Sequence, residues 1–246
     1  LAFGHAETST GARSDAEALC GLAQKYDCLS IVDAVTSLGG SELQVDGWGI
    51  DAIYSGTQKC LSCVPGLSPV SFSEKAAEVI RNRSSKVQSW FLDLSLVMGY
   101  WGPESKRAYH HTAPVNSLYA LHESLVILKE EGLENAWNRH AANHAAFAAG
   151  VKAMGLSFVV DEEHRLPQLN AVTIPDGVDE AAVDGEQGRR RRTAVACQDR
   201  PGSLLIGGRG NRRRRGEGVR ERGARWRRSL LQRGHAAGHG HAGLPR

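Results

Sequence analysis

The first 183 residues alternate short hydrophobic runs with amphipathic segments. Hydrophobic positions recur with helical spacing in SDAEALCGLAQKYD, which opens with the capping-box pattern Ser14-x-x-Glu17. The runs CLSIVDAV, GIDAIYSG and SPVSFS are short, apolar and bounded by turn residues, and each predicts a buried strand. The segment SEKAAEVIRNR predicts a helix after the third strand. Strands that alternate with helices predict an α/β domain with a largely parallel sheet and right-handed crossovers.

A different pattern begins near residue 116. Two long helices are predicted over residues 116–131 and 134–154, and the segments LSFVVD and LNAVTIPD predict strands that follow them. These elements indicate the start of a further α+β unit. We therefore divide the chain into a large α/β domain at residues 1–115, the long helices and the start of a small C-terminal domain at 116–183, and a tail at 184–246.

The tail differs from the rest of the chain in composition. Residues 1–183 carry 13 Lys+Arg and 22 Asp+Glu, a net charge of −9, whereas residues 184–246 carry 17 Arg, no Lys and five acids, a net charge of +12. One interpretation is an Arg/Gly-rich segment that binds nucleic acid non-specifically, because guanidinium groups neutralise phosphates. The other is a frame-shifted translation of GC-rich coding DNA. It would be revealed if a one-base shift of the reading frame near codon 184 restored the C-terminus of the protein. Disorder is expected in either case.

Length and composition bound the function further. The chain has 246 residues, 41% of them hydrophobic, which is enough for one large α/β domain. It contains no apolar run near the roughly 18 residues that a membrane helix needs, so no membrane association is predicted. The sequence begins with Leu1, and we expect it to start inside a protein. Its five cysteines do not suggest a disulfide framework, and Cys60-x-x-Cys63 lacks the second ligand pair of a zinc site, so no metal is predicted.

Two side chains carry the chemistry of the first domain. Asp33 and Lys59 each follow a predicted strand at its carboxyl end, and ligands of open α/β sheets bind at that edge. A carboxylate and an amine at one edge suit pyridoxal phosphate: the lysine forms a Schiff base with the aldehyde, and the aspartate pairs with the protonated pyridine nitrogen. Taken alone, the two residues are weak evidence for a cofactor, and a surface position or an ion pair is then the favoured interpretation.

Four motifs extend this pattern. HAETSTG, IVDAVTSLGG, YSGTQKCLSCVPG and AYHHTAPV occur in this order. They closely resemble the class V aminotransferases of fold type I, in the branch of alanine–glyoxylate, serine–pyruvate and serine–glyoxylate aminotransferases, over about residues 1–183. Cysteine desulfurases share the plan but typically carry His before the Schiff-base lysine, where this chain has Gln58. The alternative is another class V activity of the lyase or desulfurase type.

The resemblance implies a role for each matching residue around pyridoxal 5'-phosphate. Lys59 would hold the cofactor and move a proton between the substrate and the cofactor. Asp33 would bind the pyridinium nitrogen, and Val35 would pack against the ring. Thr8 would lie near the cofactor, and Gln58 would bond its phosphate. For Thr8 and Gln58, hydrogen bonding within a turn is the alternative.

The last motif implies a partner subunit. Tyr109 and Thr112 match residues that reach the phosphate from the neighbouring subunit, which implies a homodimer with shared active sites; packing in a core or interface is the alternative. The intervening pair His110–His111 is not predicted to bind metal, because adjacent side chains point in different directions on a regular element. His140 and His144 are predicted to lie on a solvated or packed helix face.

The resemblance also implies fold and function. We expect the large domain of a fold type I transferase, N-terminally truncated, plus an incomplete C-terminal α+β unit. The family reaction moves an amino group from alanine or serine to glyoxylate or pyruvate, so the ligands would be small amino acids and 2-oxo acids. The family's Gly-rich phosphate turn, ring-stacking aromatic residue and carboxylate-binding arginine have no counterpart, so the 246 residues alone are expected to be nearly inactive. The expected compartment is the cytoplasm, with the peroxisome as the alternative.

Overall fold

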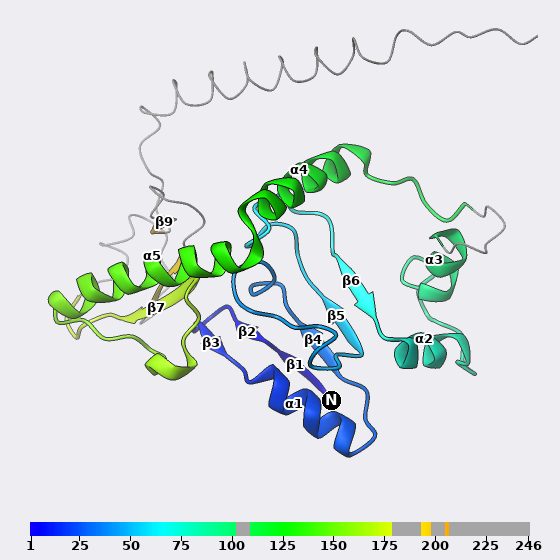
Figure 1. Cartoon of the computed structure of the whole chain (residues 1–246), viewed down its shortest axis with the longest axis horizontal. Helices are drawn as coiled ribbons and strands as arrows, with labels where there is room; N and C mark the ends of the chain where they lie inside the picture. The colour runs from blue at the N-terminus through cyan, green and yellow to red at the C-terminus, as the bar shows by residue number, and fades with distance from the viewer. Residues whose placement is uncertain (102–108, 179–192, 198–204, 207–246) are drawn as a thin grey trace, which may run out of the picture. The chain divides into compact units, whose positions relative to one another are not determined.

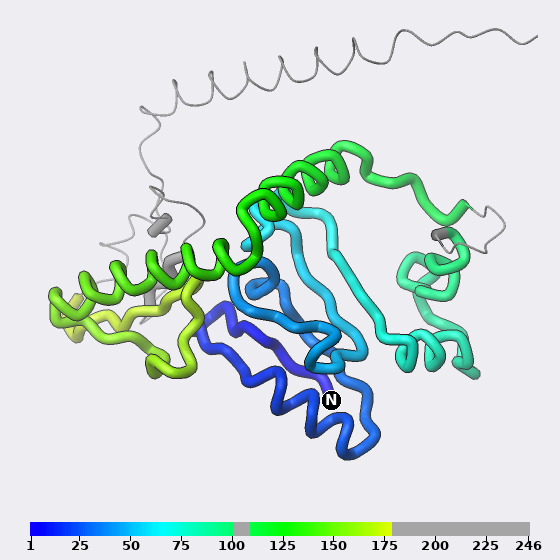
Figure 2. Tube along the Cα trace, in the orientation of Figure 1, coloured from blue at the N-terminus to red at the C-terminus, as the bar shows by residue number. Residues whose placement is uncertain are grey.

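The structure is a computed structural model that describes residues 1–101, 109–178, 193–197 and 205–206, all within the first of two units, residues 1–207 and 208–246. A four-stranded sheet in the order β1–β4–β5–β6 organises the N-terminal part (Figure 1). Its strands are β1 (Ala2–Gly4), β4 (Ile31–Asp33), β5 (Ala52–Tyr54) and β6 (Val70–Phe72). Figure 2 shows how the blue start of the chain and the cyan β6 segment come into the same sheet.

The direction of the strands confirms a largely parallel sheet. β4 is parallel to both β1 and β5, whereas β6 is antiparallel to β5. Helix α1 (Ala16–Lys25) forms the connection from β1 to β4. The connection from β5 to β6, residues 55–69, contains no helix, so it returns the chain in the opposite direction instead of crossing over.

One face of the sheet forms the hydrophobic core. Phe3, Val32 and Ile53 are neighbours in the strand register and point to the same face. Val32 and Ile53 belong to a buried cluster with Cys20 of α1. The pattern of hydrophobic residues in α1 therefore serves to cover this face.

The N-terminus of α1 differs from the predicted capping box. Asp15 is the N-cap, and its carboxylate accepts a hydrogen bond from the Ala18 N–H at 3.0 Å. The Ser14 hydroxyl instead donates to the Gly4 carbonyl at 2.8 Å. The prediction was wrong because a tertiary contact recruits Ser14, and a carboxylate at the N-cap also interacts favourably with the helix dipole.

A buried carboxylate joins the amino ends of three elements. Asp51 precedes β5 and accepts hydrogen bonds from the Ser30 N–H at 3.0 Å and from the Ser73 hydroxyl at 2.8 Å. Ser30 precedes β4, and Ser73 is the N-cap of α2 (Glu74–Arg81). Since a buried carboxylate is stable only when such donors surround it, Asp51 fixes these elements to one another.

The opposite face of the sheet is more exposed. Ile31 is 45% exposed, Tyr54 41% and Val70 53%, although all three lie on strands. Asp33 shares this face, because it alternates with the buried Val32 along β4. The sheet therefore has one covered face and one accessible face.

Among the remaining elements, the two long helices and the strand in LNAVTIPD were predicted from the sequence. The other strands and helices are β2 (Ala6–Glu7), β3 (Ala12–Arg13), α3 (Leu94–Trp101), α4 (Val115–Glu131), α5 (Leu133–Ala153), the 3-10 helix η1 (Glu162–His164), β7 (Leu169–Thr173), β8 (Thr193–Cys197) and β9 (Leu205–Ile206). The strand predicted in LSFVVD is wrong: Phe158 forms only an isolated bridge with Val172 of β7.

The tail is described only in part. β7, β8 and β9 form a separate antiparallel sheet, so seven tail residues have regular structure where the sequence predicted none. All the arginine-rich runs lie outside the described residues, together with their nucleic-acid and frame-shift interpretations. In the described part of the chain, no helix combines the length and the apolar character that a membrane span requires.

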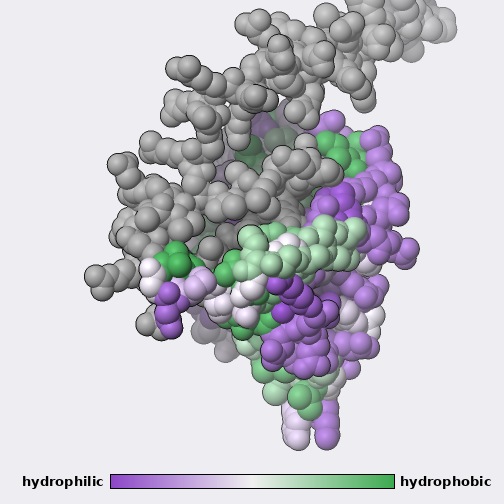
Figure 3. Space-filling model, turned by 90° about the vertical axis from the view of Figure 1, so that its left-hand side faces the viewer, coloured by the Kyte–Doolittle hydropathy of each residue, from purple (hydrophilic) through white to green (hydrophobic). Residues whose placement is uncertain are grey.

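Hydrophobic side chains are also found at the surface. Figure 3 shows green hydrophobic residues beside purple hydrophilic ones on the face that it presents. Helix α4 has no buried residue, and its Tyr119 is 72% exposed, Leu125 46% and Ile127 45%. An exposed helix with this many large apolar side chains is typical of an interaction surface rather than of a solvated one.

His140 gives the protein a pH-dependent stability. It is only 3% exposed on α5, and burial lowers its pKa from 6.5 to about 4, with a smaller effect from the charge of Arg139. As the pH falls from 6.5 towards 4, the unfolded chain therefore takes up a proton that the folded protein does not, and stability is lost.

We expect this histidine to contribute a loss of about 1.4 kcal/mol per pH unit within that window. Urea unfolding of the wild type and of His140→Gln at a series of pH values measures the contribution. The wild type should show the steeper slope, and His122→Gln, at an exposed position of α4, should keep the wild-type slope. Equal slopes for the wild type and His140→Gln would contradict the assignment.

Candidate active site

Three parallel strands end side by side and create the site. Gly4 of β1 pairs with Asp33 of β4, which pairs with Tyr54 of β5, and each is the last residue of its strand. The alignment continues into the loops, since the His5 N–H donates to the Asp33 carbonyl and the Ala34 N–H to the Tyr54 carbonyl, both at 2.9 Å. The loops that follow β1, β4 and β5 therefore begin at one edge, as the sequence predicted.

The Asp33 carboxylate is held by two neutral donors. Its Oδ1 accepts from the Val35 N–H at 2.9 Å, and its Oδ2 accepts from the Tyr54 hydroxyl at 2.7 Å. Asp33 is half-buried, and among the described residues no ion pair engages it. A carboxylate that is oriented but not neutralised fits a cationic N–H group of a ligand.

A cavity of about 500 Å³ opens beside this carboxylate. It brings together three of the predicted site residues, Thr8, Asp33 and Val35. Its lining is completed by Ala2, Phe3, Gly4, Ala6, Glu7, Ile31 and Tyr54. The cavity therefore extends along β1 and β4 and reaches the carboxyl ends of β1, β4 and β5.

Thr8 is connected to the loop that follows β4. Its hydroxyl is 2.7 Å from that of Thr36, and either oxygen can be the donor. Thr36 is buried, whereas Thr8 is exposed. The Thr8 hydroxyl is thus oriented by Thr36 and accessible from the cavity, so it can form a hydrogen bond with a polar group of a ligand.

His5 stands behind the same loop as a neutral group. It is buried, and its Nδ1 atom has no hydrogen-bond partner among the residues that the structure describes. Burial and, to a smaller extent, the positive charge of Arg13 together lower the pKa of His5 to about 4. Its ring meets the edge of Trp48 at a centroid distance of 5.9 Å, which indicates a packing role.

Lys59 lies in a tightly bonded loop after β5. Its carbonyl accepts from the Ser62 N–H at 2.8 Å, and Ser62 has a φ of 56°, in the left-handed region. The Thr57 hydroxyl donates to the Val64 carbonyl at 2.6 Å, and the Ser55 hydroxyl ties the loop to the Ala34 carbonyl at 3.0 Å. Lys59 itself is half-buried and is not part of the cavity lining beside Asp33.

Gln58, the neighbour of Lys59, is folded back over its own loop. A Cβ atom added at Gly56 would lie 2.8 Å from Gln58 Oε1, so the side chain occupies the space that the glycine leaves. Gln58 is exposed and does not line the cavity. Its predicted contact with a phosphate stays a prediction.

Tyr109 and Thr112 lie together but away from the cavity lining. Their hydroxyls form a hydrogen bond, and both side chains are exposed. Between them, His110 is 5% exposed and stacks on Trp90 at a centroid distance of 4.2 Å. The buried His110 thus holds this segment in place, while the hydroxyls of Tyr109 and Thr112 remain accessible to another molecule.

The two adjacent histidines face each other, contrary to expectation. The Nδ1 atoms of His110 and His111 are 2.7 Å apart, because the segment is irregular rather than helix or strand. One ring must donate and the other accept in this contact. Within the residues that the structure describes, no group of three or more His, Cys, Asp or Glu side chains is suited to a metal ion.

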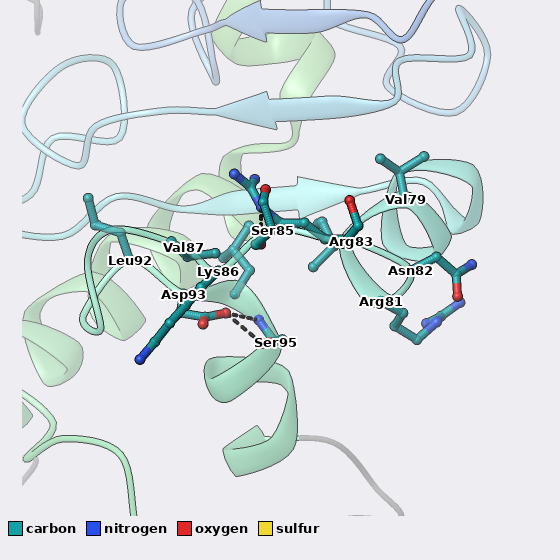
Figure 4. A pocket seen from close by; sticks show the side chains of 13 residues that line it. Val79, Arg81, Asn82, Arg83, Ser85, Lys86, Val87, Leu92, Asp93 and Ser95 are labelled. Atoms are coloured by element: carbon teal, nitrogen blue, oxygen red, sulfur yellow. Dashed lines mark hydrogen bonds between the residues drawn. The ribbon is translucent and has the colours of Figure 1, made fainter.

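A larger pocket of about 740 Å³ lies between α2 and α3 (Figure 4). It contains Arg81, Arg83 and Lys86, but the side chains of Arg81 and Lys86 extend in opposite directions. Arg81 is paired with Glu74, and the Arg83 Nε donates to the Ser85 carbonyl at 2.9 Å. Because these cations do not converge on one point, we do not assign the active site to this pocket.

Gln168 links the site to a distant part of the chain. It is fully buried, and its Nε2 donates to the Thr36 carbonyl at 3.1 Å and to the Ser41 hydroxyl at 2.7 Å. The backbone at Gly11 and the backbone at Leu169, next to Gln168, also approach closely. Gly11 has a φ of +81°, and a Cβ atom there would lie 2.5 Å from the Leu169 carbonyl oxygen. The loop behind Thr8 is therefore fixed by residues that lie more than 120 positions later.

Two contributors to the site were missed from the sequence. Tyr54 carried a signal, because it ends the β5 run as Asp33 ends the β4 run, and parallel neighbours meet at their carboxyl ends. Gln168 carried no local signal: nothing in its surrounding sequence indicates a partner at Thr36.

Comparisons with known proteins agree with this geometry. The family model of class-V aminotransferases matches residues 1–185. The chain is 43% identical over 175 residues to rat (Rattus norvegicus) alanine–glyoxylate aminotransferase, covering 70% of this chain and 42% of that protein. It is 39% identical over 201 residues to the (S)-ureidoglycine–glyoxylate transaminase of Bacillus subtilis strain 168, covering 74% and 48%.

Solved structures give the same result. The crystal structure of alanine–glyoxylate aminotransferase from Nostoc sp. superimposes with a TM-score of 0.72 and 48% identity, over 75% of this chain and 48% of that chain. The chain thus spans less than half of the length of these relatives.

Removing the buried amide of Gln168 should destabilise the protein. In Gln168→Met the volume is similar, but the Ser41 hydroxyl and the Thr36 carbonyl lose a buried donor, at an expected cost of about 1–3 kcal/mol. Urea denaturation measures this change. Gln44→Met, at an exposed position, is the matched control and should change little; a Gln168→Met variant as stable as that control would show that the network contributes nothing.

Proposed function

Since the chain belongs to the class-V aminotransferase family, we propose that it forms part of a pyridoxal-phosphate-dependent transaminase that moves an amino group from alanine or serine to glyoxylate or pyruvate. Glyoxylate stands in the names of the rat, Bacillus and Nostoc proteins, which supports it as the amino acceptor. The substrates are accordingly a small amino acid and a small 2-oxo acid.

The state of the Asp33 carboxylate is the observation that carries this proposal. It lies at a cavity, oriented by two neutral donors, and no ion pair among the described residues neutralises it. The pyridine nitrogen of pyridoxal phosphate, once protonated, supplies the cationic N–H donor that such a carboxylate lacks. When bound, the cofactor withdraws electrons from the substrate and so makes its Cα proton removable.

The chain's own residues would divide the remaining tasks. Asp33 would hold the ring by its nitrogen, while Val35 would pack against the ring face and Thr8 would bond a polar group. Lys59 would bind the cofactor covalently through its amine and would then carry the proton from the substrate Cα. The hydrogen bonds around Ser55, Thr57 and Ser62 restrict the Lys59 loop, which supports this positioning.

We further propose that the functional form is a homodimer. Tyr109 and Thr112 present two neighbouring hydroxyls at the surface, on a segment anchored by the buried His110. In the dimer they would bond the cofactor phosphate of the partner subunit, with Gln58 contributing from the same subunit as Lys59. The exposed apolar residues of α4 offer area for such an interface.

Cofactor capture tests the role of Lys59. Pyridoxal phosphate is added to the protein, and reduction with borohydride then fixes the cofactor to the lysine that holds it. Mass spectrometry of a digest should locate the label on the peptide that contains Lys59, and Lys59→Ala should lose it. Lys86→Ala, which removes an exposed lysine, should label normally; a label on a different lysine, or none on any, would contradict the assignment.

Transamination is tested with each substrate pair in turn. The cofactor-loaded full-length protein, of which this chain forms part, is given alanine or serine together with glyoxylate or pyruvate, and the amino and oxo acid products are quantified by chromatography. We expect the alanine–glyoxylate pair to turn over and Lys59→Ala to reduce the rate by at least about 10²-fold, because the proton carrier is lost. Cofactor bound at Lys59 without transfer from any donor would refute the proposed reaction while leaving the family assignment intact.

A further inference from the structure

Tyr54 contacts the Asp33 carboxylate directly, yet the sequence pattern did not single it out. Its hydroxyl donates to Oδ2 at 2.7 Å, while Oδ1 is taken by the Val35 N–H at 2.9 Å. Oδ1 is thus held by the loop that follows β4, and Oδ2 by the neighbouring strand β5. Together the two bonds define the plane in which the carboxylate lies.

The sheet register explains why Tyr54 can reach this position. Tyr54 and Asp33 are paired across the parallel strands β5 and β4, so their side chains leave the same face side by side. Both residues line the cavity of about 500 Å³. Tyr54 is 41% exposed, so its ring is not required to fill the hydrophobic core.

The hydrogen bond leaves room for a ligand. A carboxylate has about four acceptor positions, of which the Val35 N–H and the Tyr54 hydroxyl occupy two. Oδ2 can therefore accept from Tyr54 and from a ligand N–H at the same time. The bond to Asp33 raises the pKa of Tyr54 above its usual value of 10, so the hydroxyl keeps its proton at neutral pH and remains a donor.

From this geometry we propose that Tyr54 is a positioning residue for the cofactor: its hydroxyl holds the Asp33 carboxylate in the orientation that receives the ring N–H of pyridoxal phosphate. The inference rests on the proposed function and adds a residue to it. Without the hydroxyl, Oδ2 loses a donor and the carboxylate can rotate about its bond to Cβ. Tyr54 therefore acts on the ring nitrogen only through Asp33.

A cofactor analogue isolates that effect. In 1-deazapyridoxal phosphate a carbon replaces the ring nitrogen, so no N–H faces Asp33, while the aldehyde and the phosphate are unchanged. Binding of both compounds to the wild type and to Tyr54→Phe is measured by equilibrium titration. We expect Tyr54→Phe to bind pyridoxal phosphate roughly tenfold more weakly, the loss of one charge-assisted hydrogen bond, and to bind the analogue as the wild type does.

Two further variants complete the comparison. In an Asp33→Asn background, the additional change Tyr54→Phe should have no effect on pyridoxal phosphate binding, because the group through which it acts is gone. Tyr26→Phe removes the hydroxyl of a tyrosine that is 69% exposed outside the cavity, and it should bind both compounds normally. Equal losses for cofactor and analogue would overturn the proposal, and so would the absence of any loss.

The hydrogen bond itself is tested without cofactor. In protein carrying ¹³C at the Cζ position of tyrosine, the Tyr54 signal is identified by its disappearance in Tyr54→Phe. Asp33→Asn should shift this signal and leave that of Tyr26 in place; an unmoved Tyr54 signal overturns the inference even where the cofactor binds. A shifted signal in a protein that binds neither compound would instead refute the proposed function, and with it the role of Tyr54 toward the cofactor.

Discussion

The parallel register of β1, β4 and β5 is the constraint on which the candidate site depends. It places Gly4, Asp33 and Tyr54 in a row, so that three loops start from one edge of the sheet. A shift of one residue in β4 would turn Asp33 towards the core and bring Val32 to the cavity. The apolar cluster of Cys20, Val32 and Ile53 opposes this shift, because Val32 is buried in the cluster only in the observed register. The packing of the covered face thereby determines the chemistry of the accessible one.

Two aspartates at opposite ends of the sheet illustrate how environment separates structure from function. Asp51, at the amino end, is buried and receives donors from Ser30 and Ser73, so its carboxylate is committed to holding elements together. Asp33, at the carboxyl end, is half-buried beside a cavity and keeps acceptor positions that no described residue fills. The same type of side chain thus joins structural elements at one end of the sheet and remains available to a ligand at the other.

The sequence predicted what local patterns and strand topology determine. Hydrophobic periodicity located the strands β4, β5, β6 and β7 and the helices α1, α2, α4 and α5. The rule for strand ends brought Asp33 to the cavity, where Thr8 and Val35 join it. Lateral and long-range contacts were not accessible in this way. The bond of Tyr54 to Asp33 depends on the register between two strands, and that of Gln168 to the Thr36 carbonyl on the docking of a segment 132 positions away. The N-cap of α1 was misplaced by one residue for a similar reason, since Ser14 is engaged by the Gly4 carbonyl.

The position of Gln168 has a consequence for the order in which the protein assembles. During synthesis, the strands that carry Asp33 and Tyr54 leave the ribosome well before Gln168, which lies 127 residues after its partner Ser41. Until then the described residues offer the Thr36 carbonyl, besides water, the weaker sulfur donor of Cys60. The loop that contains Thr36 therefore receives its hydrogen bond from Gln168 late, through a contact of high sequence separation. A nascent chain that stops before residue 168 carries Thr8, Asp33 and Tyr54 without that hydrogen bond.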